Sequence, residues 1–590
     1  MYYQHFSGRC SFLLKKLLSF LKPYVRESIL GPLFKLLEAT FELFVPLVVA
    51  YLIDHGIGEN DSSAIWRAFL LLALLGCIGL LCSVTAQYFA AKASVGCAGA
   101  IRHALFAHVQ TLSFTNLDTI GASTLITRMT SDVNQVQSGL NLTLRLLLRS
   151  PFVVFGAMIM AFTIDVRSAL IFAVTIPVLS VVVFGIMLIS MPLYKKVQGQ
   201  LDGVLSSTRE SLSGARVIRA FRMEEAAGAE FAARNEALTT TQKFVGKISA
   251  LMNPITYVII NAAIILLLYT GAVQVETGVL TQGQVVALYN YMSQILIELI
   301  KMANMIIQLT KATACAKRIE DVLDTRAAQE WSDKTPAAAK SDDRVVFSHV
   351  SLRYAGAGAD SLTDISFTAR TGETIGIIGG TGSGKSSLVQ LIPRFYDATG
   401  GTVTVDGADV LSYPADVLRS KIGFVLQRAS LFHGTIRDNL KWGQPDATDA
   451  ELQYAMEQAQ AGEIYASKGL DHMLEQDGRN LSGGQRQRLT IARALVRKPE
   501  ILILDDSASA LDLATDAALR KAIAEIDYHP TVFIVSQRTS SLRQADEILV
   551  LDDGVLVGKG THEKLLETCD VYREIHESQI GKSTKGGKQA

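Results

Sequence analysis

Three stretches in the first half of the 590-residue chain carry no charged residue and are longer than a lipid bilayer requires. They run from Ala68 to Ala91, from Ser168 to Tyr194 and from Ile248 to Val275. A helix needs about 20 apolar residues to cross the hydrocarbon core, whereas helices of soluble proteins average about 12 residues. Buried helices of a soluble protein would have to be about twice their usual length, so these stretches predict membrane-spanning helices.

Three weaker candidates complete a set of six spans, which predicts a membrane domain over residues 25–324. Charged residues interrupt two of the three. The candidates are Ile29 to Ile53 with Lys35, Glu38 and Glu42, then Ser150 to Ile164, and then Thr277 to Thr310 with Glu298 and Lys301.

The distribution of Lys and Arg predicts the orientation of these spans. Residues 1–26, 92–135 and 195–247 carry five, three and nine of them, whereas the alternate loops carry only Arg67 and Arg167. Because cytoplasmic loops are enriched in Lys and Arg, both chain ends are expected in the cytoplasm, with the protein in the cytoplasmic (inner) membrane. Leucines at helical spacing among the first 22 residues, with three lysines, predict a helix lying on the membrane surface over residues 1–24 rather than a cleaved signal peptide.

Composition excludes two classes of protein. The chain has 56 basic and 56 acidic residues, whereas a dedicated nucleic-acid binder normally carries a basic excess, so no nucleic-acid partner is expected. Its six cysteines form no Cys-x-x-Cys pair, so the sequence gives no support for a zinc site. The mean hydropathy of +0.27 favours a membrane protein.

Two long loops between the spans are polar but keep helical patterning, and we expect each to run out from the membrane and back as two helices. Their tips, near residues 114–123 and 211–222, are the candidate contacts with whatever lies below the membrane. A polar, alanine-rich stretch at residues 325–343 is typical of a linker to a second domain, predicted over residues 344–580. Residues 581–590 are expected to be a disordered tail.

The second domain opens with a phosphate-binding pattern. An apolar strand-like run, Thr374 to Ile378, precedes a glycine-rich turn, and a helical pattern follows. Glycines let backbone N–H groups surround phosphate oxygens, a lysine places a cation on the outer phosphates, and a serine hydroxyl can bind Mg²⁺. The predicted nucleotide-binding residues of this loop are Gly379, Gly380, Thr381, Gly382, Ser383, Gly384, Lys385, Ser386 and Ser387.

A second apolar run, Ile501 to Asp505, ends in a carboxylate. Alone it would be an ordinary end of a strand. Together with the glycine-rich loop, Asp505 fits the second Mg²⁺-coordinating position of a P-loop nucleotide hydrolase, with Ser386 as the first. Such enzymes act by positioning phosphates and neutralising their charge.

The sequence Leu-Ser-Gly-Gly-Gln lies 20 residues before Asp505 and resembles the signature motif of ABC transporters. With this motif in place, the whole chain resembles an ABC exporter half-transporter, in which a six-helix membrane domain with long intracellular loops precedes an α/β nucleotide-binding domain with a helical subdomain. The glycines can open a helix and expose a second set of N–H groups to an anion. In this family that loop completes the ATP site of the opposite subunit, which here implies Ser482, Gly483, Gly484 and Gln485.

The resemblance implies further roles and cofactors. It assigns Tyr354 to stacking on adenine, Gln427 to sensing Mg²⁺ and touching the membrane domain, and Ser509 and Asp512 to a loop that crosses the dimer interface. It implies ATP and Mg²⁺ as cofactors. The implied partners are a second half-transporter, the lipid bilayer and a small amphiphilic substrate such as a drug, lipid or peptide.

Two positions depart from the family pattern. Active members place a glutamate after the Mg²⁺ aspartate and a histidine at the switch position, where this chain has Asp506 and Gln537. The shorter carboxylate would sit about 1.5 Å back from the water it should polarise, which costs on the order of 100-fold. Glutamine cannot carry a titratable proton. The pattern resembles the subunit of a heterodimeric exporter that keeps an intact signature motif beside a degenerate ATP site of its own. A homodimer with two slow sites is the alternative.

Charged residues within the spans suggest a substrate pathway. One hypothesis is that Glu38, Glu42 and Glu298, with Gln294 and Asn290, line a cavity that favours cationic amphiphiles. The interpretation we favour is that Glu38 pairs with Lys35 and Glu298 pairs with Lys301, purely for structure, because buried charges are usually paired. The sequence leaves three functions open: an exporter, an ATP-gated channel or regulator, and an importer that works with a separate binding protein.

Overall fold

The computed structural model describes residues 19–336, 342–507 and 509–585, which group into two compact units. The first unit comprises the chain up to Gln110 together with Ser123–Thr325, and the second comprises Thr111–Ala122 together with the chain from Arg326 onward. The surface helix expected over residues 1–24 lies almost entirely outside the described residues. Of that segment, Lys22–Tyr24 form a short 3₁₀ turn, η1, at the start of the first long helix.

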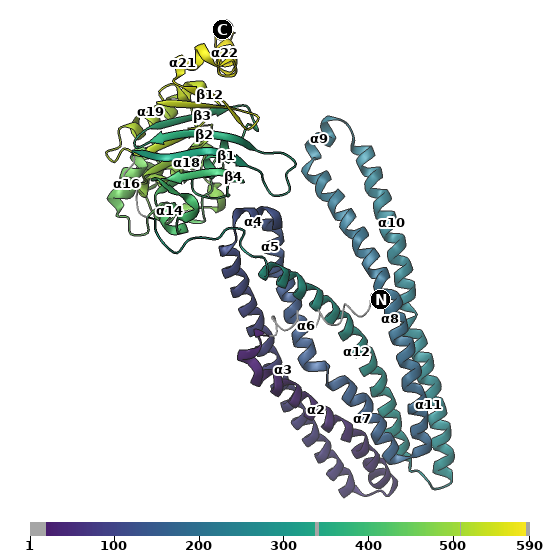
Figure 1. Cartoon of the computed structure of the whole chain (residues 1–590). Helices are drawn as coiled ribbons and strands as arrows, with labels where there is room; N and C mark the ends of the chain where they lie inside the picture. The colour runs from purple at the N-terminus through teal and green to yellow at the C-terminus, as the bar shows by residue number, and fades with distance from the viewer. Residues whose placement is uncertain (1–18, 337–341, 508, 586–590) are drawn as a thin grey trace. The chain divides into compact units, whose positions relative to one another are not determined.

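The first unit is entirely helical in the described residues. It holds six helical segments long and apolar enough to cross a membrane (Figure 1). After η1 its elements are α2 (Val25–Tyr51), η2 (Leu52–Gly58), α3 (Ser62–Thr111), α5 (Ala122–Thr127), η3 (Arg128–Asp132), α6 (Val133–Leu146), α7 (Arg149–Ile164), α8 (Val166–Ser213), α9 (Ala215–Ala220), α10 (Glu224–Ala250), α11 (Met252–Glu276) and α12 (Gln282–Leu323).

Four of the six predicted spans fall within these helices, whereas Ile248–Val275 crosses the turn at Leu251 and Thr277–Thr310 begins in the turn before α12. Several helices continue past the predicted ends. Helix α3 runs on to Thr111 and α8 runs on to Ser213, which is how the two long loops come to be helical. Local sequence fixes where helices begin: the Asp165 side chain accepts a hydrogen bond from the Ser168 backbone N–H at 2.7 Å and caps α8.

Small residues let the helices of this unit approach closely. A Cβ placed on Gly31 of α2 would lie 3.5 Å from the backbone nitrogen of Ala90 in α3. Close packing of small residues is a main source of helix association in membranes. At the centre of the unit Tyr291 is fully buried, and its hydroxyl donates to the Leu43 carbonyl at 2.6 Å.

The second unit contains two main sheets. In the first, the order β2-β1-β4-β5 is antiparallel; in the second, the order is β12-β11-β3-β10-β9-β6, parallel apart from β12 at the edge. A two-stranded pair, β7-β8, completes the described strands. The strands are β1 (Asp343–Leu352), β2 (Leu362–Arg370), β3 (Thr374–Gly379), β4 (Gly400–Val405), β5 (Ala408–Asp409), β6 (Ile422–Val425), β7 (Gly434–Thr435), β8 (Met473–Leu474), β9 (Ile501–Asp505), β10 (Thr531–Val535), β11 (Glu547–Asp552) and β12 (Val555–Gly560).

Helices cover the six-stranded sheet and fill the long insert between β6 and β9. Because β6 and β9 are neighbours in the sheet, the roughly 75 residues between them form a mainly helical insert, which includes the helices labelled α16 and α18 in Figure 1. The helices are α4 (Phe114–Ile120), α13 (Lys385–Gln390), η4 (Val410–Ser412), α14 (Ala415–Ser420), α15 (Ile436–Lys441), α16 (Asp449–Gln458), α17 (Gly462–Lys468), η5 (Gln476–Gly478), α18 (Gly483–Val496), α19 (Leu513–Ala524), α20 (Thr539–Leu542), α21 (His562–Thr568) and α22 (Asp570–Lys585).

Helix α4 corrects the predicted domain boundaries. The expected membrane domain, residues 25–324, includes Thr111–Ala122, but this segment groups with the second unit. The reason is a set of specific contacts: the Phe114 ring packs against Phe395 with centroids 4.6 Å apart, and the Tyr396 hydroxyl donates to Asp118 at 2.6 Å. The first predicted loop tip therefore contacts the nucleotide-binding fold.

Parts of the predicted linker and of the predicted disordered tail have a defined structure that the sequence did not indicate. Gln329 is 7% exposed and donates to Asp397 at 3.0 Å, and Trp331 lies under the guanidinium of Arg394 at 4.5 Å. The part of the linker from Arg326 to Pro336 thus packs on the second unit. Helix α22 continues to Lys585, so residues 581–585 of the expected disordered tail are helical, and the rest of the tail lies outside the described residues.

Candidate nucleotide site and membrane cavity

The glycine-rich loop joins the end of β3 to the start of α13. Gly382 and Gly384 have φ angles of +85° and +91°, a left-handed conformation that favours glycine. A Cβ on Gly379 would lie 2.1 Å from the Leu551 carbonyl oxygen, so that glycine is required by packing. A Cβ on Gly380 or Gly382 would meet nothing within 4 Å in the described chain. The outer face of the loop is therefore open, which suits backbone N–H groups that bind phosphate.

Lys385 is folded onto this loop. Its side chain is nearly buried, and its Nζ donates to the carbonyl oxygens of Gly379 at 3.0 Å and Gly380 at 2.5 Å. Burial lowers the pKa of Lys385, while the nearby Asp506 and Asp505 carboxylates oppose that change. The lysine keeps its ammonium beside the open glycines, where the outer phosphates of a nucleotide would compensate its charge.

Ser386 and Asp505 meet although they lie 119 residues apart. Strand β10 lies between β3 and β9, so the carboxyl ends of β3 and β9 face the same edge of the sheet. The Ser386 hydroxyl donates to Asp505 Oδ1 at 2.8 Å, and Asp505 is 3% exposed. Burial raises the pKa of Asp505. Mg²⁺ prefers oxygen ligands such as a hydroxyl at the end of a P-loop and a carboxylate at the end of a neighbouring strand. Ser386 and Asp505 therefore fit a Mg²⁺ ion bound with ATP.

Asp506 points toward the loop that carries Gln427. The Gln427 Nε2 donates to Asp506 Oδ2 at 3.2 Å, and the Asp506 backbone N–H donates to the Val535 carbonyl at 3.1 Å. Burial raises the pKa of Asp506, against the hydrogen bond from Gln427 and the charges of Lys385 and Arg538. Lys385, Ser386, Asp505, Asp506 and Gln427 thus form one group.

Gln537 lies two residues beyond Val535, in the bend that follows β10. Its side chain is exposed, and its backbone carbonyl accepts a hydrogen bond from Gln579 Nε2 at 2.7 Å. The structure therefore places Gln537 at the rim of the site rather than within the group around Asp505.

Tyr354 is held beside the P-loop by its hydroxyl. It donates to Ser387 Oγ at 2.9 Å, and its ring meets that of Tyr396 edge-on with centroids 5.0 Å apart. Tyr396 in turn donates to Asp118 of α4. Sequence reasoning missed Tyr396 and Asp118. The adjacent aromatic pair Phe395-Tyr396, shortly after the helix that follows the P-loop, was the available signal.

The signature residues form a helix start. The Ser482 hydroxyl accepts from the Gln485 backbone N–H at 3.2 Å, and the Gln485 side chain accepts from the Ser482 N–H at 3.1 Å. This reciprocal capping begins α18. A Cβ on Gly483 would meet nothing within 4 Å in the described chain, whereas one on Gly484 would lie 3.4 Å from the Ala510 carbonyl. The start of α18 also borders a cleft of about 370 Å³ shared with Gln427.

Ser509 and Asp512 have partners within their own loop. The Ser509 hydroxyl donates to the Asp506 carbonyl at 2.9 Å, which connects this loop directly to the acid pair. Asp512 caps α19 by accepting from the Thr515 backbone N–H at 2.9 Å and from its hydroxyl at 2.8 Å. Both residues remain accessible at the surface, as an interface role requires.

In the first unit, Glu38 and Glu42 border a cavity of about 610 Å³ between α2, α3 and α7. Its wall also includes Ser83 and Arg149, and the rest is apolar. Glu298 is not among the lining residues and is only 3% exposed. Glu298 therefore does not line this cavity, because its carboxylate is taken up by partners of its own chain; its assignment to a substrate pathway stays a prediction.

Those partners form an ion cluster centred on Arg149, which sequence reasoning missed. Arg149 donates to Glu298 Oε1 and to Glu42 Oε2, each at 2.6 Å. Glu298 also accepts from Ser150 at 2.8 Å and from Lys301 at 2.8 Å. Separately, Lys35 pairs with Glu38 at 2.5 Å. Both structural pairs considered from the sequence are thus present, and the predicted span began at Ser150, one residue after the arginine.

Comparison with known proteins agrees with this fold. Two family profiles match: "ABC transporter transmembrane region" over residues 28–299 and "ABC transporter" over residues 362–509. An uncharacterized ABC transporter ATP-binding protein of Mycobacterium tuberculosis is 38% identical over 581 residues, which cover 98% of this chain and 100% of that protein. A probable multidrug resistance ABC transporter ATP-binding/permease protein of Bacillus subtilis is 33% identical over 98% of this chain and 100% of its own length.

Among solved structures, a bacterial Atm1-family ABC exporter with ATP bound shares the fold, with a TM-score of 0.77 over 95% of this chain and 99% of that one, at 22% identity. The chain belongs to the ABC transporter family. Within that family it is an exporter half-transporter, with its membrane and ATP-binding domains fused in one chain. Its ATP-binding domain is that of a transporter driven by ATP hydrolysis, and such exporters function as dimers in the lipid bilayer.

Proposed function

We propose that this chain is one half of a heterodimeric exporter, and that the ATP site on its own P-loop binds nucleotide but hydrolyses it slowly. The observation that carries this proposal is Asp506, whose short carboxylate is already held by the Gln427 amide at 3.2 Å. A carboxylate one methylene shorter than glutamate reaches less far toward a water at the outer phosphate, and positioning supplies most of the rate in this chemistry.

Gln537 adds a second deficit. A histidine at this position could accept a proton or carry a positive charge, whereas a glutamine amide can only form neutral hydrogen bonds. The exposed side chain of Gln537 is accessible to a phosphate, so binding is retained while proton transfer is lost.

The intact signature supports the other half of the proposal. Ser482 and Gln485 cap α18, and Gly483 leaves its backbone open where nothing in the described chain requires a glycine. An open helix start of this kind binds anions. We infer that it serves the phosphates of ATP held by a partner chain, and that the partner carries glutamate and histidine where this chain has Asp506 and Gln537.

For the substrate we propose a small amphiphilic molecule, with cationic compounds favoured, exported across the cytoplasmic membrane with both chain ends in the cytoplasm. The multidrug name of the Bacillus subtilis relative and the cavity bordered by Glu38 and Glu42 support this class. Glu42 is 41% exposed and gives one oxygen to Arg149, which leaves the other available to a substrate cation.

The test is the ATPase rate of the purified chain alone in lipid nanodiscs, compared with the double variant Asp506→Glu, Gln537→His. We expect slow turnover in the wild-type chain and a gain on the order of 100-fold in the variant. The matched control is Asp505→Asn added to the variant, which should abolish the gain. Rapid turnover by the unaltered chain without a partner would contradict the proposal and favour a homodimer with two working sites.

A further inference from the structure

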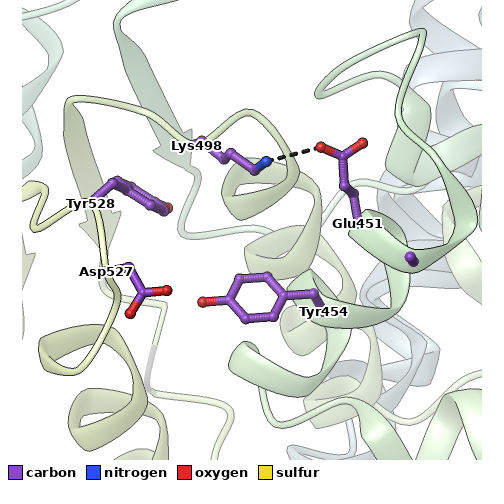
Figure 2. Close-up of a pocket in the computed structure, with 6 residues that line it drawn as sticks. Glu451, Tyr454, Lys498, Asp527 and Tyr528 are labelled. Carbon is purple, nitrogen blue, oxygen red and sulfur yellow. Dashed lines mark hydrogen bonds and ion pairs between the residues drawn. The ribbon is translucent and has the colours of Figure 1, made fainter.

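A second pocket lies in the ATP-binding unit, away from the P-loop. It has a volume of about 480 Å³ and is bounded by three elements: α16, the turn after α18, and the turn between α19 and β10 (Figure 2). These elements belong partly to the helical insert and partly to the flank of the six-stranded sheet. Its lining residues are Ala450, Glu451, Tyr454, Lys498, Asp527 and Tyr528.

Two tyrosines form the aromatic walls of this pocket. In Figure 2 the hydroxyl group of each tyrosine points into the space between the two side chains. The hydroxyl group of Tyr454 also points toward Asp527. Tyr454 is 39% exposed, so its ring face is accessible from solvent. Burial, together with the neighbouring Tyr454, raises the pKa of Tyr528 to about 12, so that phenol is neutral at physiological pH. Neutral phenol faces attract cations.

Some polar groups of the pocket have hydrogen-bond partners among the described residues, and others have none. The Tyr528 hydroxyl is buried and has no hydrogen-bond partner in the part of the chain that the structure describes. The exposed Asp527 carboxylate likewise has no ion pair or hydrogen bond with any described residue. A buried hydroxyl without a partner costs free energy, which a ligand with an N–H donor would recover.

The one cation among the described residues that line the pocket is already neutralised. Lys498 Nζ donates to Glu451 Oε1 at 2.9 Å, and Glu451 also accepts from the Thr448 backbone N–H at 3.0 Å. The hydrogen bond from Lys498, followed by that from Thr448, lowers the pKa of Glu451 to about 2, so its carboxylate stays charged and paired. With Lys498 and Glu451 balanced, Asp527 leaves the pocket with an uncompensated negative charge.

We propose that this pocket is a binding site for a small planar organic cation bearing N–H donors, such as an aromatic amidine or amine. The ring of the ligand lies against Tyr454, its cationic nitrogens face Asp527, and one N–H is accepted by the Tyr528 hydroxyl. Nucleotides and other anions are disfavoured, because the ammonium of Lys498 that could bind them is held by Glu451. The lining residues of this pocket and those of the cavity in the membrane unit are different.

The experiment compares three ligands of nearly the same shape on the full-length chain in neutral phosphatidylcholine nanodiscs. Benzamidine is cationic, benzamide is neutral and benzoate is anionic. Affinities are obtained by titration with ligand-observed NMR. We expect benzamidine to bind most tightly and benzoate least. Equal affinity for all three, or no binding of benzamidine, overturns the proposal.

Three variants locate the site. Asp527→Asn should weaken benzamidine binding about three- to fivefold, as expected for an exposed ion pair. Tyr528→Phe should weaken it about fivefold without lowering the thermal unfolding midpoint, because the hydroxyl it removes stabilises nothing in the free chain. The matched control, Asp446→Asn, changes an exposed aspartate of the helical insert that carries Tyr454 but is not part of the pocket lining, and it should leave affinity unchanged.

A fourth variant separates this pocket from the membrane cavity. If Glu42→Gln abolishes benzamidine binding while Asp527→Asn leaves it unchanged, the ligand sits between the membrane helices and the proposal is wrong. If Asp527→Asn and Tyr528→Phe weaken binding while Glu42→Gln does not, the site is the one in Figure 2.

Discussion

The two units treat their buried carboxylates in opposite ways. Glu298 in the membrane unit accepts from Arg149, Lys301 and Ser150, so two cations and a hydroxyl of its own chain satisfy it. Asp505 in the ATP-binding unit is equally buried, but its described side-chain partner is the neutral hydroxyl of Ser386. A buried charge is tolerated when it is paired, and otherwise its pKa changes.

This difference in pairing distinguishes a buried carboxylate with a structural role from one with a functional role. The Glu298 cluster is complete within the chain, so its removal should affect stability in every state of the protein. The acid pair of Asp505 and Asp506 is incomplete, because burial raises both pKa values and no cation among the described residues binds either carboxylate directly. A divalent cation brought by the nucleotide would complete it. A buried carboxylate is therefore neutralised by its own chain in the membrane unit, whereas in the ATP-binding unit it remains available to a cation from a ligand.

The largest expected effect comes from breaking the membrane cluster. Arg149→Ala leaves Glu298 and Glu42 without their shared guanidinium, and removal of one partner of a buried ion pair costs about 3–5 kcal/mol. Thermal unfolding in detergent, followed by tryptophan fluorescence, measures the loss. The double variant Arg149→Met, Glu298→Gln removes both charges and should recover most of the stability. If the single variant unfolds like the wild-type chain, the cluster is not structural and the comparison fails.

A smaller effect is expected at the acid pair, and it should appear only with metal. Asp505→Asn keeps a hydrogen-bonding group beside Ser386 but removes the charge, so the nucleotide-free protein should lose no stability at neutral pH. Affinity for ATP in the presence of Mg²⁺ should fall about 100-fold, as expected when a metal ligand is lost. Titration with a fluorescent ATP analogue, with and without Mg²⁺, measures this. An equal loss in both conditions would assign Asp505 to folding.

The pH dependence of stability sharpens the same contrast. Raised pKa values at Asp505 and Asp506 mean that the folded, nucleotide-free protein holds these protons more tightly than the unfolded chain. The resulting stability is fully present below the unfolded-state pKa of about 4. This stability is lost as the pH rises through the raised pKa values. For each acid the total loss is about 1.4 kcal/mol for every pH unit by which its folded pKa exceeds its unfolded pKa. The double variant Asp505→Asn, Asp506→Asn should flatten this slope in thermal unfolding at mildly acidic pH. An unchanged slope would show that neither acid holds a proton.

The smallest effect is expected at Tyr354. Tyr354→Phe keeps the ring and loses the hydrogen bond to Ser387, worth about 1 kcal/mol or less, so ATP affinity should fall no more than about fivefold. Tyr354→Ala also loses base stacking and should cost more, about 1–3 kcal/mol. The ratio of the two affinities separates the ring from the hydroxyl. If the two variants bind alike, Tyr354 does not stack on the base.

Much of the fold could be predicted because its signals are local. Uncharged runs such as Ser168 to Tyr194 are visible without any knowledge of packing, and the P-loop residues are consecutive, so their geometry follows from glycine positions and one strand end. The group of Lys385, Ser386 and Asp505 was recognisable because two short motifs specify it.

What escaped prediction depends on contacts between distant residues. Arg149 meets Glu42 and Glu298 across 107 and 149 residues, so nothing beside it in the sequence reveals its partners. Because Arg149 was hidden as a partner, Glu298 was considered for a pathway as well as for a pair with Lys301. Tyr396 and Asp118 are 278 residues apart. The pocket around Tyr454 and Tyr528 assembles from three separated segments, none of which has a recognisable pattern.

The attachment of α4 to the ATP-binding fold makes that unit discontinuous along the chain. Phe114 and Asp118 shield Phe395 and Tyr396, and the segment that does so is inserted between two membrane helices. A fragment that starts at Asp343 would therefore expose an aromatic surface to water and tend to associate with itself. If related transporters exchange ATP-binding domains, the contact between α4 and the Phe395-Tyr396 pair has to be preserved. We therefore expect these two segments to be inherited together in such exchanges.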